Sequence, residues 1–410
     1  MLTAIKKDGT WMTLPERISA NVLAEWRKSA NYYCPCCKME MSIKAGNVRI
    51  PHFAHKNNSS CRASSEPESA YHLMGKRKLF QWFLSHGYQV DLEAYFPEIK
   101  KRADILATIG GNRYAIEFQC SVIPEVEFIE RTRAYQSVGI KPIWILAAKR
   151  LKRKSMYEFS LSRFQWLFVS GSWHHPFLWM YCPETNHLSV LKNLTPFTPR
   201  TVFAELTSAS LTLLPPSRAL PQNSFRFPFL PAWRYKRKDW SLHRVKTARR
   251  TNPFFEELYL HHITPATIPI EVGVPVRGML LIETAPIEWQ AWFYMDVFQE
   301  KKIGEKIFMA NIIHFFKKCS KKGEIKFRPL PLLHEKPPLE YPVGQYIKLL
   351  EHMGYISKLE EGVFKVEKEF SLPFNSDQVQ MMEKFFYDKH KLMLEKGNIQ
   401  YNQGEHPYLS

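Results

Sequence analysis

Two short apolar segments, residues 102–106 and 114–119, flank a Gly-Gly-Asn turn signal in this chain. This pattern predicts a β-hairpin that brings Asp104 close to Glu117. Because strand side chains alternate between faces, Glu117 and Gln119 leave the sheet on the same side. Such a group can bind Mg²⁺, which takes one or two protein carboxylates and fills its other positions with water and phosphate. The alternative is a half-solvated hairpin whose polar face carries these residues by chance.

A helix is predicted immediately before the hairpin, over residues 68–83, with the serines at 64–65 as candidate caps. Residues four apart share one face of a helix, so Glu68, His72 and Lys76 form a polar stripe. On an arbitrary helix this stripe would be a solvated ladder of salt bridges. Its position just before the acidic hairpin favours a shared site.

Both helices and strands are predicted around the hairpin. Residues 88–93 are predicted to form a first strand, 128–135 a second helix and 143–146 a buried strand. Pro124 stands near the beginning of the second helix, and Gly139 follows its end. The resulting order is helix, three strands, helix, strand, which indicates an α/β domain.

Cysteine and histidine residues cluster near the N-terminus, where four of the seven cysteines lie in one short segment. The C-x₂-C spacing is typical of a zinc knuckle, and one downstream His and one Cys would complete a tetrahedral site. The preferred ligands are Cys34, Cys37, His55 and Cys61. His52 and Cys36 are competing candidates, and the alternative is a set of reduced, partly buried cysteines with two core histidines.

Composition indicates a globular chain of 410 residues with two or three domains. The 57 Lys and Arg residues against 39 Asp and Glu give a net charge of +18, which favours polyanionic partners such as DNA. The sequence shows no membrane-spanning apolar run and no apolar leader, so we expect a cytoplasmic protein. Clustered cysteines in that reducing compartment favour metal binding over disulfides.

Patterns in the remainder of the chain are weaker. Residues 164–169 and 177–182 are predicted to be strands that complete the sheet, and a Pro-rich connector at 214–231 begins a separate region. A helix followed by a hairpin at 341–367 suggests a winged-helix-like unit or an ordinary α+β element. No glycine-rich phosphate loop is present, so an ATP-driven motor is not supported.

A basic and aromatic cluster lies within this later region, over residues 234–250 and the tryptophan before them. Its basic members are Arg234, Lys236, Arg237, Lys238, Arg244, Lys246, Arg249 and Arg250, and its aromatic members are Trp233, Tyr235 and Trp240. Such a cluster can bind phosphates while the aromatic rings stack on unpaired bases. The alternative is a solvated basic helix whose aromatic residues pack inward.

The order of these elements, with Asp104 on the second strand and Glu117 on the third, resembles the PD-(D/E)XK nuclease superfamily. The individual motifs resemble the CoiA family of competence proteins, which act in bacterial natural transformation. The motifs, which span about the first half of the chain, are Glu68…His72…Lys76, Arg102-Ala-Asp104, Ile116-Glu117-Phe118-Gln119-Cys120-Ser121, Arg131…Tyr135 and Ile143-Trp144-Ile145-Leu146.

The resemblance implies a nuclease site at Asp104 and Glu117, which would ligate Mg²⁺ or Mn²⁺. Gln119 stands where the superfamily has a lysine, and a neutral amide can orient water but cannot supply a positive charge. Lys76 would supply the missing cation, His72 would transfer a proton or contact phosphate, and Glu68 would be an outer ligand or hold Lys76.

The resemblance also implies a treble-clef-like or zinc-ribbon-like element holding structural Zn²⁺, with paired strands at 41–44 and 47–50. The predicted fold is therefore α/β, a PD-(D/E)XK restriction-endonuclease-like core with a small N-terminal zinc-binding element and a mainly helical C-terminal region. The expected boundaries are 1–64, 65–200 and 201–410.

The implied function is processing of incoming single-stranded DNA for recombination during transformation, as a metal-dependent deoxyribonuclease. The alternative is a non-catalytic DNA-binding scaffold that assists the recombinase. Retention of Asp104 and Glu117 favours the enzyme, whereas Gln119 in the lysine position favours the scaffold.

Overall fold

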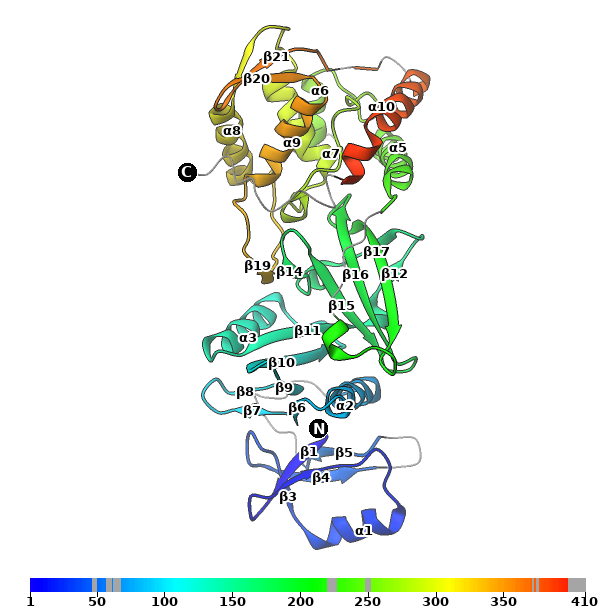
Figure 1. Ribbon diagram of the computed structural model, residues 1–410, viewed down its shortest axis with the longest axis vertical. Helices are drawn as coiled ribbons and strands as arrows, with labels where there is room; N and C mark the ends of the chain where they lie inside the picture. Colours follow the sequence, from blue (N-terminus) through cyan, green and yellow to red (C-terminus); the bar gives the residue numbers. More distant parts are fainter. Residues whose placement is uncertain are drawn as a thin grey trace. The chain divides into compact units, whose positions relative to one another are not determined.

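The computed structural model describes residues 1–45, 50–56, 61, 68–219, 227–247, 252–370, 372–373 and 376–396 (Figure 1). The chain forms two compact units. Unit 1 comprises Met1–Leu151, Leu178–Val190 and Thr207–Pro221, and unit 2 comprises Lys152–Phe177, Leu191–Leu206 and Gln222–Ser410. Within the described part of the chain, no helix has the length and apolar character needed to cross a membrane.

The N-terminal part of unit 1 is a five-stranded sheet in the order β2-β1-β3-β4-β5, accompanied by one helix. Its elements are β1 (Thr3–Lys6), β2 (Trp11–Thr13), α1 (Ala20–Ser29), β3 (Tyr32–Tyr33), β4 (Glu40–Lys44) and β5 (His52–His55). The buried side chains of Tyr32, Met41, Ile43 and Phe53 form its small core.

The strand that pairs with β4 differs from the prediction. Residues 47–50 were expected to pair with 41–44, whereas the structure pairs β4 with β5, with Met41 opposite His55. Residues 47–49 lie outside the described residues. The physical reason is the apolar alternation of β5, which directs Phe53 into the core and leaves the flanking residues partly exposed.

The nuclease-like part of unit 1 contains a mixed sheet in the order β6-β9-β10-β11-β15-β16. β9 pairs antiparallel with β6 and β10, whereas β11 pairs parallel with β10 and β15. The elements are α2 (Ala70–Ser85), β6 (Gln89–Leu92), β7 (Tyr95–Phe96), β8 (Lys101–Arg102), β9 (Ile105–Ile109), β10 (Asn112–Gln119), α3 (Glu125–Ser137), β11 (Lys141–Ala147), the 3₁₀ turn η1 (Ala148–Arg150), β15 (Phe177–Cys182), β16 (His187–Pro196), β17 (Thr201–Ser210) and the 3₁₀ turn η2 (Pro216–Arg218). Phe177 of β15, residues 191–196 of β16 and residues 201–206 of β17 belong to unit 2.

The predicted β9–β10 hairpin is confirmed. Ile109 faces Asn112 across a two-residue turn, in which Gly110 and Gly111 both have positive φ, 56° and 77°. Glycine adopts this backbone at both positions with little strain, so the turn fixes the register of the hairpin. The predicted first strand, second helix and buried strand are also present, as β6, α3 and β11.

α2 and α3 cover opposite faces of β10. Phe118 points to α2, where its ring stacks on Tyr71 and lies against Gly75. Glu117, one residue earlier, points to the other face and contacts Arg131 and Tyr135 of α3. The period of two along a strand thus assigns adjacent residues of β10 to two different helices.

The start of α2 differs from the prediction in one respect. The helix begins at Ala70, because the Ser69 side chain accepts a hydrogen bond from the backbone N–H of His72 and acts as the N-cap. Glu68 therefore precedes the helix, although its carboxylate still reaches Lys76. The candidate caps at 64–65 lie outside the described residues.

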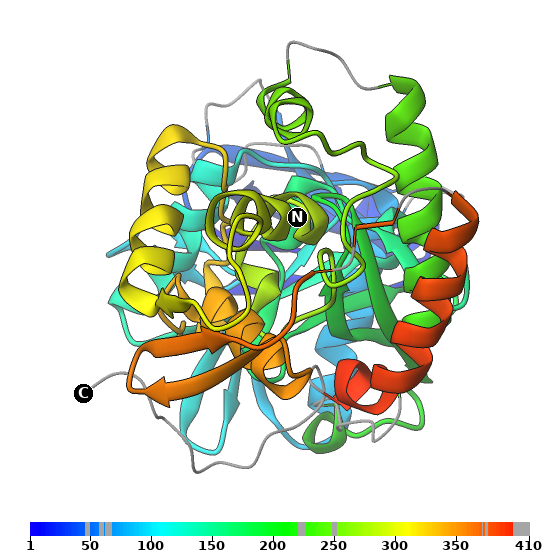
Figure 2. The ribbon, with the colours of Figure 1, turned by 90° about the horizontal axis from the view of Figure 1, so that it is seen from above.

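Unit 2 is mainly helical and has a large apolar core that includes Trp233, Trp289 and Tyr346. α5 and α10 lie side by side, joined by an ion pair between Arg237 and Glu383 (Figure 2). The elements are β12 (Lys152–Arg153), β13 (Glu158–Ser160), α4 (Arg163–Trp166), β14 (Ser170–Ser172), α5 (Leu230–Thr247), α6 (Pro253–Leu260), the 3₁₀ turn η3 (Met279–Leu281), α7 (Pro286–Phe293), a π-helical turn (Tyr294–Phe298), β18 (Lys306–Phe308), α8 (Met309–Lys322), β19 (Leu332–His334), α9 (Tyr341–His352), β20 (Ile356–Glu360), β21 (Val363–Val366) and α10 (Ser376–Lys396).

One predicted strand is a helix. Residues 164–169 were expected to be extended, but Arg163–Trp166 form α4, whereas the strand predicted at 177–182 is present as β15. The cause is a capping box, in which Ser162 and Gln165 each satisfy a backbone N–H of the other. This local polar pair prevails over the apolar run that suggested a strand.

The aromatic residues of the basic cluster do not form a stacking surface. Trp233 and Trp240 of α5 are buried, at 0% and 7% exposure, and only Tyr235 is well exposed. Arg237 is also buried and pairs with Glu383. The inward-packed alternative therefore describes α5, because the apolar core of unit 2 takes both indoles.

The helix and hairpin predicted at 341–367 are confirmed as α9, β20 and β21, and β18 completes a three-stranded sheet in the order β18-β21-β20. The hairpin turn exposes Glu360 and Glu361. α9 buries Tyr346, Ile347 and Leu350 against the core. Neither element presents a predominantly basic surface of the kind that binds DNA.

We expect Gly75→Ala to destabilise unit 1 by about 1–3 kcal/mol, the usual cost of overpacking a core. A Cβ at Gly75 would lie 2.0 Å from the Phe118 Cε1 atom, and that ring is buried. Gly344→Ala in α9 is the matched control, because its Cβ would meet nothing within 4 Å. The control should be neutral or stabilising by up to about 1 kcal/mol. Urea unfolding measures both, and equal effects would contradict the packing of α2 on β10.

Candidate functional site

The four preferred zinc ligands come together. Within the described residues, Cys34, Cys37, His55 and Cys61 form the one group of three or more metal-ligating side chains whose ligand atoms all lie within 4.8 Å of one another. Cys34 Sγ lies 3.9 Å from Cys61 Sγ, and Cys37 Sγ lies 3.3 Å from His55 Nε2.

These distances fit a tetrahedral zinc centre. Zn–S and Zn–N bonds of about 2.3 and 2.0 Å place tetrahedral ligand atoms roughly 3.5–3.8 Å apart. The turn between β3 and β4 positions the first two cysteines, since the backbone N–H of Cys34 bonds Met39 O and that of Lys38 bonds Cys34 O. Bound zinc would link this turn to β5 and Cys61 as a closed structural site.

The competing ligands lie outside this group. His52 and His55 are an odd number of residues apart on β5, so their side chains leave opposite faces of the strand. His52 Nδ1 lies 2.9 Å from Ile50 O instead. Cys36 is next to Cys37 in sequence but is not a member of the Cys₃His group.

A buried ion-pair cluster occupies the predicted nuclease site, and Lys76 is at its centre. The Lys76 side chain is fully buried, and its ammonium group donates to Glu68 at 2.7 Å and to Glu93. Its third carboxylate neighbour, Asp104 Oδ1, is 3.7 Å away. Arg102 also pairs with Glu68, at 3.2 Å.

Glu93 joins this cluster to the N-terminal sheet. Its carboxylate accepts hydrogen bonds from the backbone N–H groups of Leu2 and Thr3 and from the Thr3 hydroxyl, as well as from Lys76. Glu93 has a positive φ of 56°, which is unusual for a residue with a side chain. These contacts fix β1 to the residue that directly follows β6.

Asp104 and Glu117 have partners on different helices. Asp104 Oδ2 lies 3.0 Å from His72 Nε2 of α2 and accepts the backbone N–H of Phe118. Glu117 accepts three N–H bonds from Arg131 of α3, at 2.8–3.1 Å, and a fourth from the Tyr135 hydroxyl at 2.5 Å. Both oxygens of Glu117 are thereby engaged.

Burial and charge shift the pKa values of these acids in different directions. Burial raises the pKa of Glu117 to about 7, against the opposing charge of Arg131. Burial also acts to raise the pKa of Asp104, but the charges of His72 and Lys76 outweigh it and hold that pKa well below its usual range. For Glu93, the charges of Lys76 and Arg102 outweigh burial and lower the pKa to about 2.

Gln119 is turned away from this cluster. Its side-chain amide donates to the Ser121 carbonyl at 3.0 Å and to the Ser121 hydroxyl at 3.2 Å. It thus stabilises the loop that follows β10. In this arrangement the amide does not contact either Asp104 or Glu117.

The carboxylates have the right chemistry for Mg²⁺, but their arrangement does not fit a bound ion. Glu117 uses both oxygens for Arg131 and Tyr135, and each of the other acids in the cluster has a Lys or Arg nitrogen within 4 Å. A divalent ion needs carboxylate lone pairs and excess negative charge. It would therefore have to displace Arg131 before Glu117 could act as a ligand.

Four residues of the cluster were not among the predicted site residues, namely Glu93, Arg102, Arg131 and Tyr135. Three of them belong to motifs that carry the family resemblance, and this was the available signal. Glu93 has no such signal, because in sequence it is only the last residue of a predicted strand. Its partner Lys76 lies seventeen residues earlier, on another element.

The α/β core, with its mixed sheet and its acidic hairpin between α2 and α3, is a nuclease-like domain. Comparison with known families matches residues 15–64 to the N-terminal domain, 68–223 to the nuclease-like domain and 231–382 to the C-terminal domain of competence protein CoiA. The chain belongs to the competence protein CoiA family. Competence protein CoiA of Bacillus subtilis (strain 168) is 31% identical over 346 residues, which cover 82% of this chain and 90% of that protein. No solved structure matches the chain.

We expect purified protein to contain about one zinc ion per chain, as a closed four-ligand site does. Cys37→Ser should lose the metal and unfold the N-terminal sheet, because zinc binding supplies part of the folding energy of so small a core. Cys36→Ser is the control, since this neighbouring cysteine lies outside the group, and it should retain zinc. Atomic absorption measures the metal content. Equal zinc content in both variants would contradict the ligand assignment.

We expect Glu93→Gln to destabilise unit 1 by about 3–5 kcal/mol near neutral pH, because it removes a buried partner of Lys76. The pKa of Glu93 falls from 4.5 to about 2 on folding, so its contribution is present above pH 4.5 and is lost as the pH falls toward 2. The difference in unfolding free energy between wild type and variant should therefore become smaller at acidic pH. Urea unfolding across this pH range tests it.

Asp91→Asn is the control for Glu93→Gln, because Asp91 is an exposed acid of the same strand, β6. It should change the stability by no more than about 0.5 kcal/mol, as surface substitutions usually do. A Glu93→Gln effect that is equally small, or that does not depend on pH, would show that the buried pair does not hold unit 1 together.

Proposed function

We propose that this protein binds incoming single-stranded DNA in the cytoplasm during natural transformation and presents it to the recombination machinery, with its nuclease-like domain acting as a binding platform. The observation that carries this proposal is the state of Glu117, whose two oxygens are occupied by Arg131 and Tyr135. Family membership, the nuclease-like domain and the net charge of +18 support DNA as the partner.

Two exposed cations provide a DNA contact beside the cluster. Lys149 and Arg150 lie in η1, the turn that follows β11 at the carboxyl end of the parallel β10–β11 pair. Arg150 donates to Cys120 O at the end of β10, and the Lys149 ammonium lies 3.9 Å from the Tyr71 ring centroid. Both groups are therefore held at the strand ends where Asp104 and Gln119 are also found. Phosphates of a bound strand would contact them there.

The second candidate function is metal-dependent cleavage of that DNA. Asp104 directly precedes β9 and Glu117 lies on β10, each one residue beyond the pair formed by Ile105 and Ile116. Among the described residues, Asp104 Oδ1 has an ion-pair contact with Lys76 alone, at 3.7 Å. This candidate requires Mg²⁺ or Mn²⁺ to displace Arg131 from Glu117. It would also leave His72, with a partly exposed side chain beside Asp104, as the proton-transfer group.

We also propose that the functions follow the predicted division of the chain. Residues 1–64 would be the zinc-stabilised element, 65–200 the DNA-binding nuclease-like domain and 201–410 the mainly helical C-terminal region. The hydrogen bonds from the backbone of Leu2 and Thr3 to Glu93 support this division, because they let residues 1–64 stabilise the nuclease-like domain.

We expect wild-type protein to bind single-stranded DNA but not to cleave it with Mg²⁺ or Mn²⁺. Lys149→Gln combined with Arg150→Gln should weaken binding about tenfold and reduce the salt slope by about 1.4, since each lost phosphate contact on single strands removes about 0.7. Fluorescence anisotropy at several salt concentrations measures both quantities.

The matched control is Arg113→Gln combined with Lys141→Gln. These exposed cations lie at the amino ends of the same two strands and also lie over aromatic rings. The control should bind like wild type, and equal losses in both double variants would remove the platform proposal. Asp104→Ala serves as the background in the cleavage assay. Metal-dependent cleavage by wild type but not by Asp104→Ala would replace the platform with the nuclease.

A further inference from the structure

Residues 286–366 of unit 2 have the element order of a winged helix. α7 with its π-helical turn is followed by β18, α8, α9 and the β20–β21 hairpin, and β18 pairs with β21 to give the sheet order β18-β21-β20. α7 packs against both later helices, because Phe293 stacks on Phe316 of α8 and Trp289 meets Tyr346 of α9 edge-on. α8 and α9 therefore take the places of the two helices of a helix-turn-helix, although residues 323–340, which carry β19, lengthen the turn between them.

α9 is not available to enter a DNA groove. In a helix-turn-helix the second helix reads base edges in the major groove, whereas the first helix crosses the phosphate backbone. α9 buries Val343, Tyr346, Ile347 and Leu350, and His352 at its end is the one exposed residue of this fully described helix. A contact of this winged-helix-like segment with DNA therefore falls to α8, the helix in the backbone-crossing place.

α8 has an apolar face and a basic face. Ile312, Phe315, Phe316 and Cys319 are buried. The exposed residues of its second half are all lysines, and we call them the α8 lysine face: Lys317, Lys318, Lys321 and Lys322. Because residues three and four apart share a helix face, these side chains lie on one side of α8. The helix itself contains no acidic residue, and it lies at the edge of unit 2 in two perpendicular views (Figure 1, Figure 2).

Two of these lysines have surface ion pairs. Lys317 Nζ lies 3.2 Å from a carboxylate oxygen of Glu340, and Lys322 Nζ lies 3.7 Å from one of Glu324. The two lysine side chains are 60% and 57% exposed, and ion pairs at such exposed positions contribute at most about 1 kcal/mol. A phosphate group can therefore replace either carboxylate at little cost.

The other two lysines lack such partners. Among the described residues, Lys318 and Lys321 have no carboxylate oxygen within 4.0 Å. Lys321 is in the last turn, where a cation stabilises the helix dipole, but Lys318 precedes that turn. The charge of Lys318 acts at longer range on Asp296, a carboxyl whose pKa is raised by burial. Both ammonium groups are thus accessible to an anion from outside the unit.

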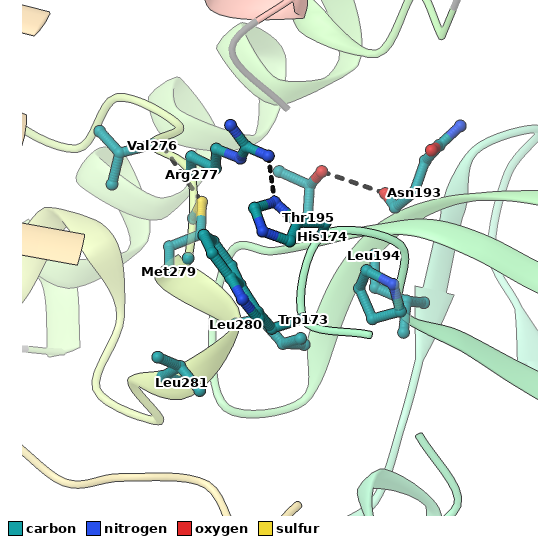
Figure 3. Close-up of a pocket in the computed structure, with 12 residues that line it drawn as sticks. Trp173, His174, Asn193, Leu194, Thr195, Val276, Arg277, Met279, Leu280 and Leu281 are labelled. Carbon is teal, nitrogen blue, oxygen red and sulfur yellow. Dashed lines mark hydrogen bonds between the residues drawn. The ribbon is translucent and has the colours of Figure 1, made fainter. Parts of the chain in front are cut away.

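A pocket elsewhere in unit 2 holds a cation of the opposite kind (Figure 3). The Arg277 guanidinium donates to His174 Nδ1 and lies 5.3 Å from the Trp173 ring centroid. Its charge is therefore used for packing within the unit. In the described part of the chain, neither Lys318 nor Lys321 has a ring contact of this kind.

The composition of α8 favours a nucleic-acid backbone over a protein partner. None of the exposed side chains of α8 is a large apolar one. Protein interfaces have an apolar core and are depleted in lysine, whereas phosphate groups need only accessible cations. Lysine acts on a phosphate as a point charge, so such contacts position a strand without reading its sequence.

We propose that the α8 lysine face binds the phosphate backbone of single-stranded DNA without sequence preference. The proposal rests on the proposed function, that the protein binds single-stranded DNA, and adds a second contact in the other unit. A single strand is favoured over a duplex because α9 is not exposed to enter the major groove, which is how a helix-turn-helix docks on duplex DNA.

The test uses full-length protein and a fluorescein-labelled oligo(dT). Lys318→Gln combined with Lys321→Gln should weaken binding about tenfold and reduce the salt slope by about 1.4, since each phosphate contact on a single strand accounts for about 0.7. Lys318→Arg combined with Lys321→Arg should bind like wild type, because both charges are kept. Fluorescence anisotropy at several salt concentrations measures the affinity and the slope.

The matched control is Lys384→Gln combined with Lys391→Gln, which removes the same charge from another helix of unit 2. These lysines of α10 are exposed and, as far as the structure describes the chain, also have no carboxylate oxygen within 4.0 Å. The control should bind like wild type. Equal losses in the two Gln double variants would show a general effect of net charge and overturn the assignment to α8.

The outcomes separate this inference from the proposed function. If wild type fails to bind oligo(dT), the proposed function fails. If wild type binds and the α8 Gln double variant binds equally well with the same salt slope, only the α8 assignment is overturned. A double variant that loses affinity for duplex DNA but keeps its affinity for oligo(dT) would likewise overturn it, since the face would then bind duplex.

A second measurement needs no variant. Acetylation of wild-type lysines with N-hydroxysuccinimidyl acetate, followed by peptide mass spectrometry, should be slower at Lys318 and Lys321 when oligo(dT) is bound and unchanged at Lys384 and Lys391. Unchanged acetylation at Lys318 and Lys321 would overturn the proposal. Protection of these two lysines by polyglutamate but not by oligo(dT) would show an acidic protein as the partner and overturn it as well.

Discussion

The buried charge of Lys76 is the constraint on which unit 1 depends. An ammonium group removed from water is tolerated only with carboxylate partners in good geometry, and Lys76 has Glu68, Glu93 and Asp104 around it. Glu93 in turn binds the backbone of β1. One buried charge therefore joins the N-terminal sheet, α2 and the hairpin. Its carboxylate partners must stay paired with Lys76, so none of them can take another role without leaving that charge unbalanced.

This constraint bears directly on function. A carboxylate that neutralises a buried cation is not available to a metal ion, because both uses require the same lone pairs and charge. Glu117 illustrates the point, since Arg131 and Tyr135 from α3 take both of its oxygens. The acidic residues of the nuclease-like domain are thus held in ion pairs, and this is the basis of the proposed binding platform.

Local chemistry made much of the fold predictable. The β9–β10 hairpin follows from two adjacent glycines, and α3 and β11 follow from their apolar periodicity. The failures also have local causes. The predicted strand at 164–169 is a helix because Ser162 and Gln165 cap it, and the strand partner of β4 is β5 because Phe53 fills the core. A weak apolar pattern does not show whether a local cap or the burial of an apolar side chain decides the structure of a segment.

The sequence by itself determined the residue types of both sites: the Cys₃His spacing, the acidic hairpin, and the His and Lys before it. Ligand spacing and strand alternation act over a few residues, so they can be read without a fold. Only the tertiary structure decided the pairings, which turned His55 rather than His52 to the cysteines and gave Glu117 to Arg131. Partners such as Lys76 and Glu93 lie on different elements, and the packing of those elements sets which charges meet.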